Sequence, residues 1–158
     1  MNSPIIGAIV MAALQVTSPS FKNNDFMPSR YTCEGDNISP ELKVDGIPQS
    51  AKSLAVTVFD PDAPNGGVVH WAQWNIQPSP IIPEKVMDGV MGENVRGKPG
   101  YTGPCPPSGV HHYHFMVYAL DTMLSIPAGS TRSDLDNAMR GHILAQGELV
   151  GLYTKTKQ

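Results

Sequence analysis

The hydrophobic pattern of the chain is mostly that of β-strands. Residues 54–59 are β-branched and aromatic, and they end at a turn-forming segment rich in Asp, Pro and Gly. Residues 112–120 are apolar on both faces in their later part, which is typical of a strand between two covering layers. Residues 149–153 could supply a last short strand. With a C-terminal helix added, these stretches predict a mainly β protein, an antiparallel β-sandwich with long loops at one end.

Residues 68–76 alternate regularly after the turn. Side chains two residues apart lie on the same face of a strand, so His70, Trp74 and Ile76 are expected on one face. Trp71 is expected on the other face. The alternation therefore predicts His70 in the middle of a strand that flanks the core.

One helix is indicated near the C-terminus. Ser133 is a suitable N-cap, and the acidic residues that follow it are favoured by the helix dipole. Spacings of three and four residues predict one apolar stripe, formed by Leu135, Ala138, Met139, His142 and Ile143. Because Gly147 can end the helix, we expect it to run from Ser133 to Gly147.

Glycine and proline add long loops to this picture. The chain has 158 residues with 15 Gly and 15 Pro, and residues 77–110 hold seven Pro and six Gly. Ordered loops of this length inside a domain are uncommon and usually functional. The length suits one domain, which we place at 14–153, with an apolar extension at 1–13 and a tail at 154–158.

The N-terminal extension belongs to an apolar run from Pro4 to Leu14. This run is too short for a membrane span, which needs about 20 residues. A secretory signal normally has a basic residue before its apolar core, and none stands here. We therefore expect an added N-terminal strand in a cytoplasmic protein, with a signal for the periplasm or for secretion as the alternative.

The charge of the chain argues against several partners. The formal net charge is −3, and charged residues make up 16% of the chain. Nucleic-acid-binding proteins usually carry a basic patch, whereas the basic residues here are scattered. We expect no nucleic-acid partner and no polybasic membrane contact, and a homodimer stays open.

Cys33 and Cys105 are the only cysteines in the sequence. Their spacing fits neither a metal-binding knuckle nor a CxxC redox motif. They could form a disulfide in an oxidising compartment, but two buried free thiols in a cytosolic protein are the preferred prediction.

Three of the five histidines fall in one tetrapeptide at 111–114. On a strand, His111 and Tyr113 point to one side, and His112 and His114 point to the other. The second pair would need a third ligand to hold zinc, and the sequence places none. We therefore expect no metal and no cofactor.

These side chains together suggest a pocket for a small oxyanion. We expect His70, His111 and Tyr113 to form its floor, with Asp60 orienting an imidazole. Ring N–H groups, the phenol and the backbone N–H groups of the glycine-containing residues 100–103 would offer many hydrogen-bond donors. Phosphate, a phosphate monoester or a carboxylate would suit such a site. The alternative is that the histidines are ordinary surface and core residues.

Several motifs, in this order, resemble the phosphatidylethanolamine-binding protein family. They are Asp-Pro-Asp-Ala-Pro at 60–64, Val-His-Trp at 69–71 and the segment 100–113, which contains Gly-Pro-Cys-Pro-Pro. The segment 30–40 is similar to the bacterial and archaeal branch of the family. The run 141–151 also resembles that branch, where it matches a C-terminal helix.

The resemblance implies a two-sheet β-sandwich with a shallow anion pocket at one end. Its pocket residues would be Asp60, Ala63, Pro64, His70, Gly103, Pro104, His111 and Tyr113. The ligand would be a phosphate, in a phospholipid headgroup or on a phosphorylated protein. Kinase inhibition, as in the family's Raf kinase inhibitor protein, is not expected, because the chain stops soon after Tyr153.

Three functions stand as hypotheses. The first is a non-catalytic module that binds small anions, and it is the one we expect. The second is a regulator that docks a phosphorylated protein. The third is an enzyme, such as a hydrolase with His70 or His111 as general base, although the sequence has no G-x-S-x-G nucleophile motif.

Overall fold

A computed structural model describes residues 12–156 of the chain. The fold is mainly β, with one α-helix. In chain order, the elements are β1 (Ala12–Ala13), β2 (Gln15–Thr17), β3 (Asp25–Phe26), the 3-10 helix η1 (Ser29–Tyr31), β4 (Leu42–Asp45), β5 (Ser53–Asp60), β6 (Val68–Ile76), β7 (Ile81–Ile82), β8 (Val90–Met91), β9 (His111–Leu120), α1 (Arg132–Met139) and β10 (Ile143–Tyr153).

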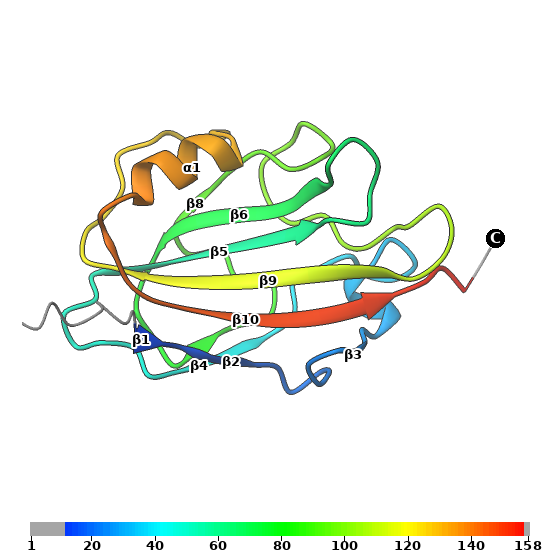
Figure 1. Cartoon of the computed structure of the whole chain (residues 1–158), viewed down its shortest axis with the longest axis horizontal. Helices are drawn as coiled ribbons and strands as arrows, with labels where there is room; N and C mark the ends of the chain where they lie inside the picture. Colours follow the sequence, from blue (N-terminus) through cyan, green and yellow to red (C-terminus); the bar gives the residue numbers. More distant parts are fainter. Residues whose placement is uncertain (1–11, 157–158) are drawn as a thin grey trace, which may run out of the picture.

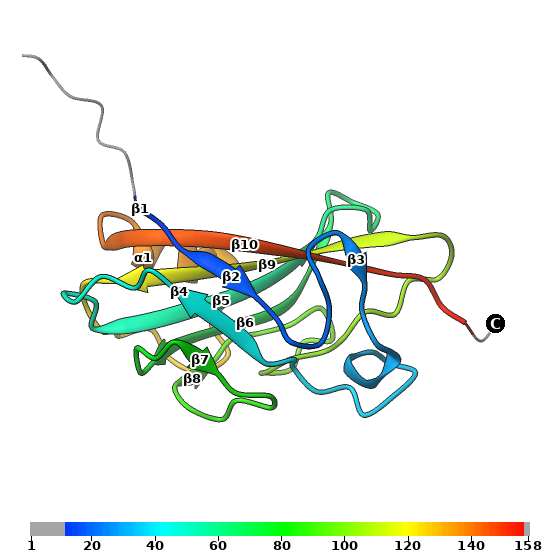
Figure 2. The same ribbon diagram turned by 90° about the horizontal axis from the view of Figure 1, so that it is seen from below.

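The strands form two sheets packed against each other (Figures 1 and 2). The larger sheet has the order β1-β10-β9-β5-β6-β8, with β3 also beside β10, and the smaller has the order β2-β4-β7. Apolar side chains fill the space between them, among them Val44, Val58 and Phe115. A sandwich was expected with antiparallel strands throughout. The larger sheet is instead mixed, because the short strands β1 and β3 run parallel to β10.

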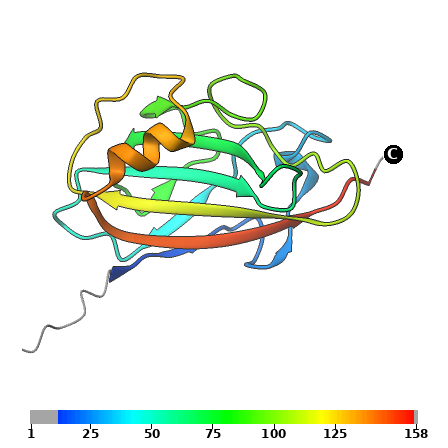
Figure 3. The same ribbon diagram turned by 45° about the horizontal axis from the view of Figure 1, so that its top comes forward.

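The helix α1 covers the other face of the larger sheet (Figure 3). Its buried residues Leu135 and Met139 belong to a second apolar cluster with Trp74 and Leu120 of the sheet. The larger sheet is therefore covered on both sides. This explains why the central strands are apolar on both faces.

The helix differs from its prediction at both ends. Thr131, not Ser133, is the N-cap, and it exchanges hydrogen bonds with Asp134 in a capping box. The helix has only eight residues, and Gly141, with a φ of 82°, lies in the turn that leads into β10. The run 141–151, expected to be helical, is mostly strand. Pairing with β9 makes it a strand, which includes the residues 149–153 where a short strand was expected.

The alternation predicted for residues 68–76 is broken near its end. The pairing of β5 with β6 has an irregularity between Leu54 and Val56, and Asn75 opposite has a φ of 57°. An extra residue in one strand reverses the faces of the residues that follow it. Ile76 accordingly lies in the core between the sheets, not with Trp74 beneath the helix.

Cys33 and Cys105 form a disulfide, so the expectation of two free thiols was wrong. The fold brings together two loops that are 72 residues apart in sequence, with the Cα atoms of the cysteines 5.5 Å apart. The N–H of Cys33 also donates to the carbonyl of Pro104 (3.1 Å). Sequence spacing carries no information on such a distance.

Of the expected N-terminal strand, only Ala12–Ala13 falls in the described range, where it forms β1. The remainder of residues 1–13 lies outside the described residues. Within 12–156, no helix is long and apolar enough to cross a membrane.

Candidate functional site

A cavity of about 280 Å³ opens at the end of the larger sheet where β5 finishes and β6 and β9 begin. Seven of the eight residues expected at a pocket line it, namely Asp60, Ala63, Pro64, His70, Gly103, His111 and Tyr113. Pro104 does not line the cavity. It lies behind the wall, where its carbonyl accepts the Cys33 N–H.

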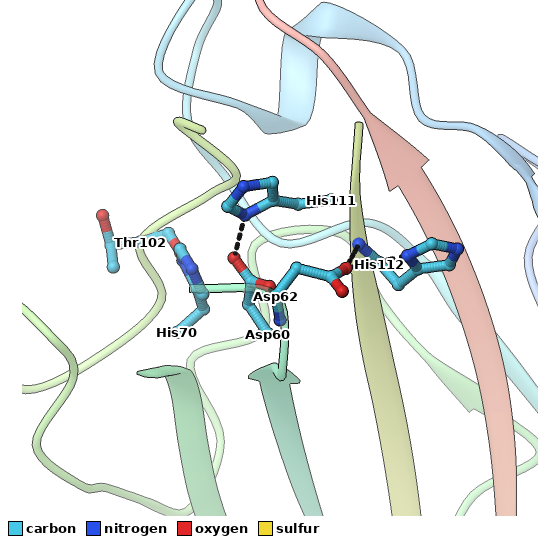
Figure 4. A network of polar contacts seen from close by, with 6 residues as sticks. All are labelled: Asp60, Asp62, His70, Thr102, His111 and His112. Carbon is cyan, nitrogen blue, oxygen red and sulfur yellow. Dashed lines mark hydrogen bonds and ion pairs between the residues drawn. The ribbon is translucent and has the colours of Figure 1, made fainter. Parts of the chain in front are cut away.

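Asp60 is the last residue of β5, and its carboxylate organises one side of the cavity. One oxygen accepts the N–H of Asp62 (2.8 Å), and the other accepts the Nδ1–H of His111 (2.7 Å; Figure 4). Asp60 is only 2% exposed, so both contacts are shielded from water. They hold the His111 ring in one orientation, with its proton on Nδ1.

His70 reaches the cavity through a second irregularity of β6. The register shifts between Val58 and Phe59 of β5, which lie opposite this part of the strand. As a result, His70 and Trp71 both lie on the Tyr113 side of the sheet, contrary to the expected alternation. The His70 ring packs edge-on against the Tyr113 ring, with centroids 5.2 Å apart.

The surroundings of His70 favour its neutral form. Its Nδ1–H donates to the carbonyl of Thr102 (2.8 Å), and the residue is only 6% exposed. Burial lowers the pKa of His70, although the Thr102 carbonyl and the Asp60 carboxylate act in the opposite direction. At neutral pH the ring therefore carries a proton on Nδ1 and a lone pair on Nε2.

Tyr113 has an unsatisfied hydroxyl group. Its oxygen is buried and makes no hydrogen bond of ordinary geometry within residues 12–156, although the backbone amide of Cys105 acts on it. Burial and the carboxylates of Asp60 and Asp62 raise the pKa of the phenol, so it stays protonated. Leaving a buried hydroxyl without a partner is costly. Tyr113 is thus a donor available to a ligand in the cavity.

The backbone N–H groups of residues 100–103 are largely occupied, contrary to expectation. The Gly100 N–H donates to the carbonyl of Gly92 (3.1 Å), and the Thr102 N–H donates to the carbonyl of His70 (2.9 Å). The Gly103 N–H donates to the side-chain oxygen of Asn37 (2.7 Å). The bonds position the wall of the cavity and leave these three amides unable to bind a ligand.

Arg96 also lines the cavity, although no motif in the sequence marks it as a site residue. Its Nε donates to the hydroxyl of Thr102 (3.1 Å), which leaves the terminal nitrogens of the guanidinium for other partners. Arg96 lies in the glycine- and proline-rich loop 77–110, whose composition indicated function without indicating which residue. It brings a permanent positive charge to the cavity.

Comparison with known families decides the membership of the chain. Residues 17–154 match the family model described as phosphatidylethanolamine-binding protein. The chain belongs to the phosphatidylethanolamine-binding protein family. The resemblance noted from the sequence motifs is therefore confirmed at the level of the family.

Relatives of this family member occur in archaea and bacteria. A UPF0098 protein of Pyrococcus horikoshii is 49% identical over 90% of this chain and 77% of its own length. A structure of a phosphatidylethanolamine-binding protein homologue from Chlamydia trachomatis has a TM-score of 0.86 and 41% identity, covering 90% of this chain and 98% of that one. The crystal structure of YbcL of Escherichia coli has a TM-score of 0.83 and 33% identity, and it covers 92% of this chain and 100% of its own.

The two remaining histidines of the tetrapeptide lie outside the cavity of this family member. His112 bonds to Asp62 (2.7 Å) and His114 pairs with Glu148 (3.3 Å), on the opposite side of β9 from Tyr113. In the described part of the chain, no three His, Cys, Asp or Glu side chains are arranged to hold a metal ion.

Proposed function

We propose that this member of the phosphatidylethanolamine-binding protein family binds a small oxyanion in the cavity, without catalysing a reaction. The observation that carries the proposal is the Tyr113 hydroxyl, which is buried in the cavity wall and has no partner in residues 12–156. A ligand oxygen would satisfy it. Arg96, on the same cavity, would supply the charge that favours an anion.

The other residues of the proposed site have supporting roles. Asp60 orients His111, and Gly103 keeps the wall close to the loop that carries Asn37. Apolar side chains, among them Ala63 and Pro64, form the rest of the wall. This arrangement suits a small ligand with one polar group, held in a largely preformed site.

A phosphate group is the chemistry that we assign to the ligand. The family name points to the headgroup of phosphatidylethanolamine, and a phosphate on another small molecule presents the same oxygen atoms. A phosphorylated protein would present it as well, which is the basis for proposing a regulatory role. The cavity is about 280 Å³, near the lower end of the range for small-molecule sites, which suits a ligand of about the size of a phospholipid headgroup.

Isothermal titration with phosphoethanolamine tests the proposal. Tyr113→Phe should weaken binding about tenfold, since a hydrogen bond to a charged group contributes on the order of 1.5–3 kcal/mol. Tyr118→Phe is the matched control, because Tyr118 lies on the same strand under the helix and should leave the affinity unchanged. Equal affinities of the wild type and Tyr113→Phe, or no binding by the wild type, would contradict the assignment.

A hydrolase remains a second candidate because of one contact, the hydrogen bond between Asp60 and His111. The nearby side chains do not favour it. The sulfur of Cys105 is in the disulfide, and the hydroxyl of Thr102 accepts from Arg96. Release of phosphate from a phosphate ester at a rate that His111→Gln abolishes would support this candidate over simple binding.

A further inference from the structure

The cavity offers fewer hydrogen-bond donors than its residue types suggest. Both imidazoles have used their Nδ1–H inside the protein, His70 on the Thr102 carbonyl and His111 on the Asp60 carboxylate. In each neutral ring the remaining nitrogen, Nε2, is therefore an acceptor. Among the described residues that line the cavity, the side-chain donors left are Tyr113, Arg96 and the hydroxyl proton of Thr102, whose oxygen accepts from Arg96.

Lone pairs on two ring nitrogens are a poor match for an oxyanion. The oxygens of an ionised phosphate, sulfate or carboxylate only accept hydrogen bonds, so each would face Nε2 without a proton between them. One added proton changes this contact into a charge-assisted hydrogen bond and also neutralises part of the anion's charge. The proton can sit on the ring or on the ligand, since the resulting contact is the same.

We infer that an oxyanion enters this cavity together with a proton, which is then shared between the ligand and an imidazole of the site. The inference rests on the proposed function and goes further, because it specifies the protonation of the complex. Binding would take up a proton from solution whenever the free ring and the free ligand are both deprotonated. Affinity would then fall as the pH rises.

His111 is the ring we assign to this proton. Its Nδ1 already faces the Asp60 carboxylate, which stabilises an imidazolium, and Asp62 also acts on it electrostatically. On the neighbouring strand, Tyr153 lies opposite His111 and donates its hydroxyl proton to Glu34. The direct contact with Asp60 is the geometric reason for assigning the proton to His111. Tyr113 is neutral beside the ring, and Arg96 brings a positive charge to the same cavity.

His70 is the less suitable ring. It is more deeply buried, and the nearby positive charge of Arg96 acts with burial to lower its pKa. The Asp60 carboxylate and the Thr102 carbonyl oppose this effect without reversing it. We therefore expect His70 to stay neutral and to accept a hydrogen bond from a ligand that carries a hydroxyl or ammonium group.

Titration calorimetry with sulfate tests the inference. Sulfate stays a dianion near neutral pH, so any pH dependence of its affinity comes from protonation of the protein. The titrations run from about pH 6 to about pH 8, across the ordinary range of histidine titration. Each is repeated in two buffers of different ionisation enthalpy, which gives the number of protons taken up. One linked proton raises the dissociation constant by at most about tenfold per pH unit, so we expect a rise with pH within that limit and net uptake of protons on binding.

Two variants locate the proton. His111→Gln should flatten the pH dependence, whereas His142→Gln, whose ring bonds to Asp121 and does not line the cavity, should leave the wild-type profile unchanged. Sulfate binding without proton uptake, at an affinity independent of pH, would overturn the inference and leave the proposed function standing. If neither sulfate nor phosphoethanolamine binds even at about pH 6, both fail. Should His111→Gln not fold, the proton count on the wild type decides alone.

Discussion

Replacing both Cys33 and Cys105 by alanine should lower the free energy of unfolding by about 4 kcal/mol. The disulfide joins residues 72 apart in sequence, so the cross-link removes a large closed loop from the freedom of the unfolded chain. The chain-entropy relation gives about 4 kcal/mol for a loop of this length. In a protein of this size, such a loss corresponds to a fall in melting temperature of about 8–16 °C.

Urea unfolding followed by circular dichroism would measure the effect on oxidised wild type, reduced wild type and the double variant. Reduction should destabilise the wild type as much as the double substitution does, and reductant should not affect the variant. Ser108→Ala is a matched control, since this exposed residue of the same loop should change stability by no more than about 0.5 kcal/mol. A loss below about 1 kcal/mol in both reduced wild type and variant would refute the loop-closure reasoning.

Three further predictions, with Gly109→Ala as a control for the first, follow from individual residues. Gly103→Ala should destabilise the protein by about 2–3 kcal/mol in thermal melts, because the added Cβ would lie 2.1 Å from the Tyr31 carbonyl oxygen. Gly109→Ala, where the Cβ would meet nothing within 4 Å, should cost about 1 kcal/mol for its positive φ alone. Thr131→Ala removes the helix N-cap and should cost about 1 kcal/mol in urea unfolding. Arg96→Ala should weaken phosphoethanolamine binding about tenfold in calorimetry, with unchanged stability, and equal affinity would remove Arg96 from the site.

The long strands were predictable because their signal is local. Residues 54–59 and 112–120 are continuous runs of strand-forming residues. The observed strand Ser53–Asp60 is longer by one residue at each end, and His111–Leu120 is longer by one residue at its start. The run 141–151 was mispredicted for a related reason. A helix was expected there from the family resemblance and from an apolar stripe that ends at Ile143, and only the ten-residue pairing with β9 decides in favour of a strand.

The candidate site likewise has residues that could be predicted from the sequence and residues that could not. Its residue types lie in short motifs, so the sequence alone could group Asp60, His70, His111 and Tyr113. Arg96 has no motif around it, and its place on the cavity follows from the path of a long loop. The disulfide was likewise missed, because the distance between Cys33 and Cys105 depends on how two loops pack.

The sequence by itself determined the family, the main strands and the kinds of side chain gathered at one end of the sheet. Only the tertiary structure decided what those side chains have left to offer a ligand. The Nδ1 atoms of His70 and His111 find acceptors 32 and 51 residues away, and the loop amides are used in the same manner. A hydrogen bond needs two groups within about 3 Å. Such proximity between distant residues is a property of the fold, and it occupies ring and amide N–H groups that the sequence presented as free donors.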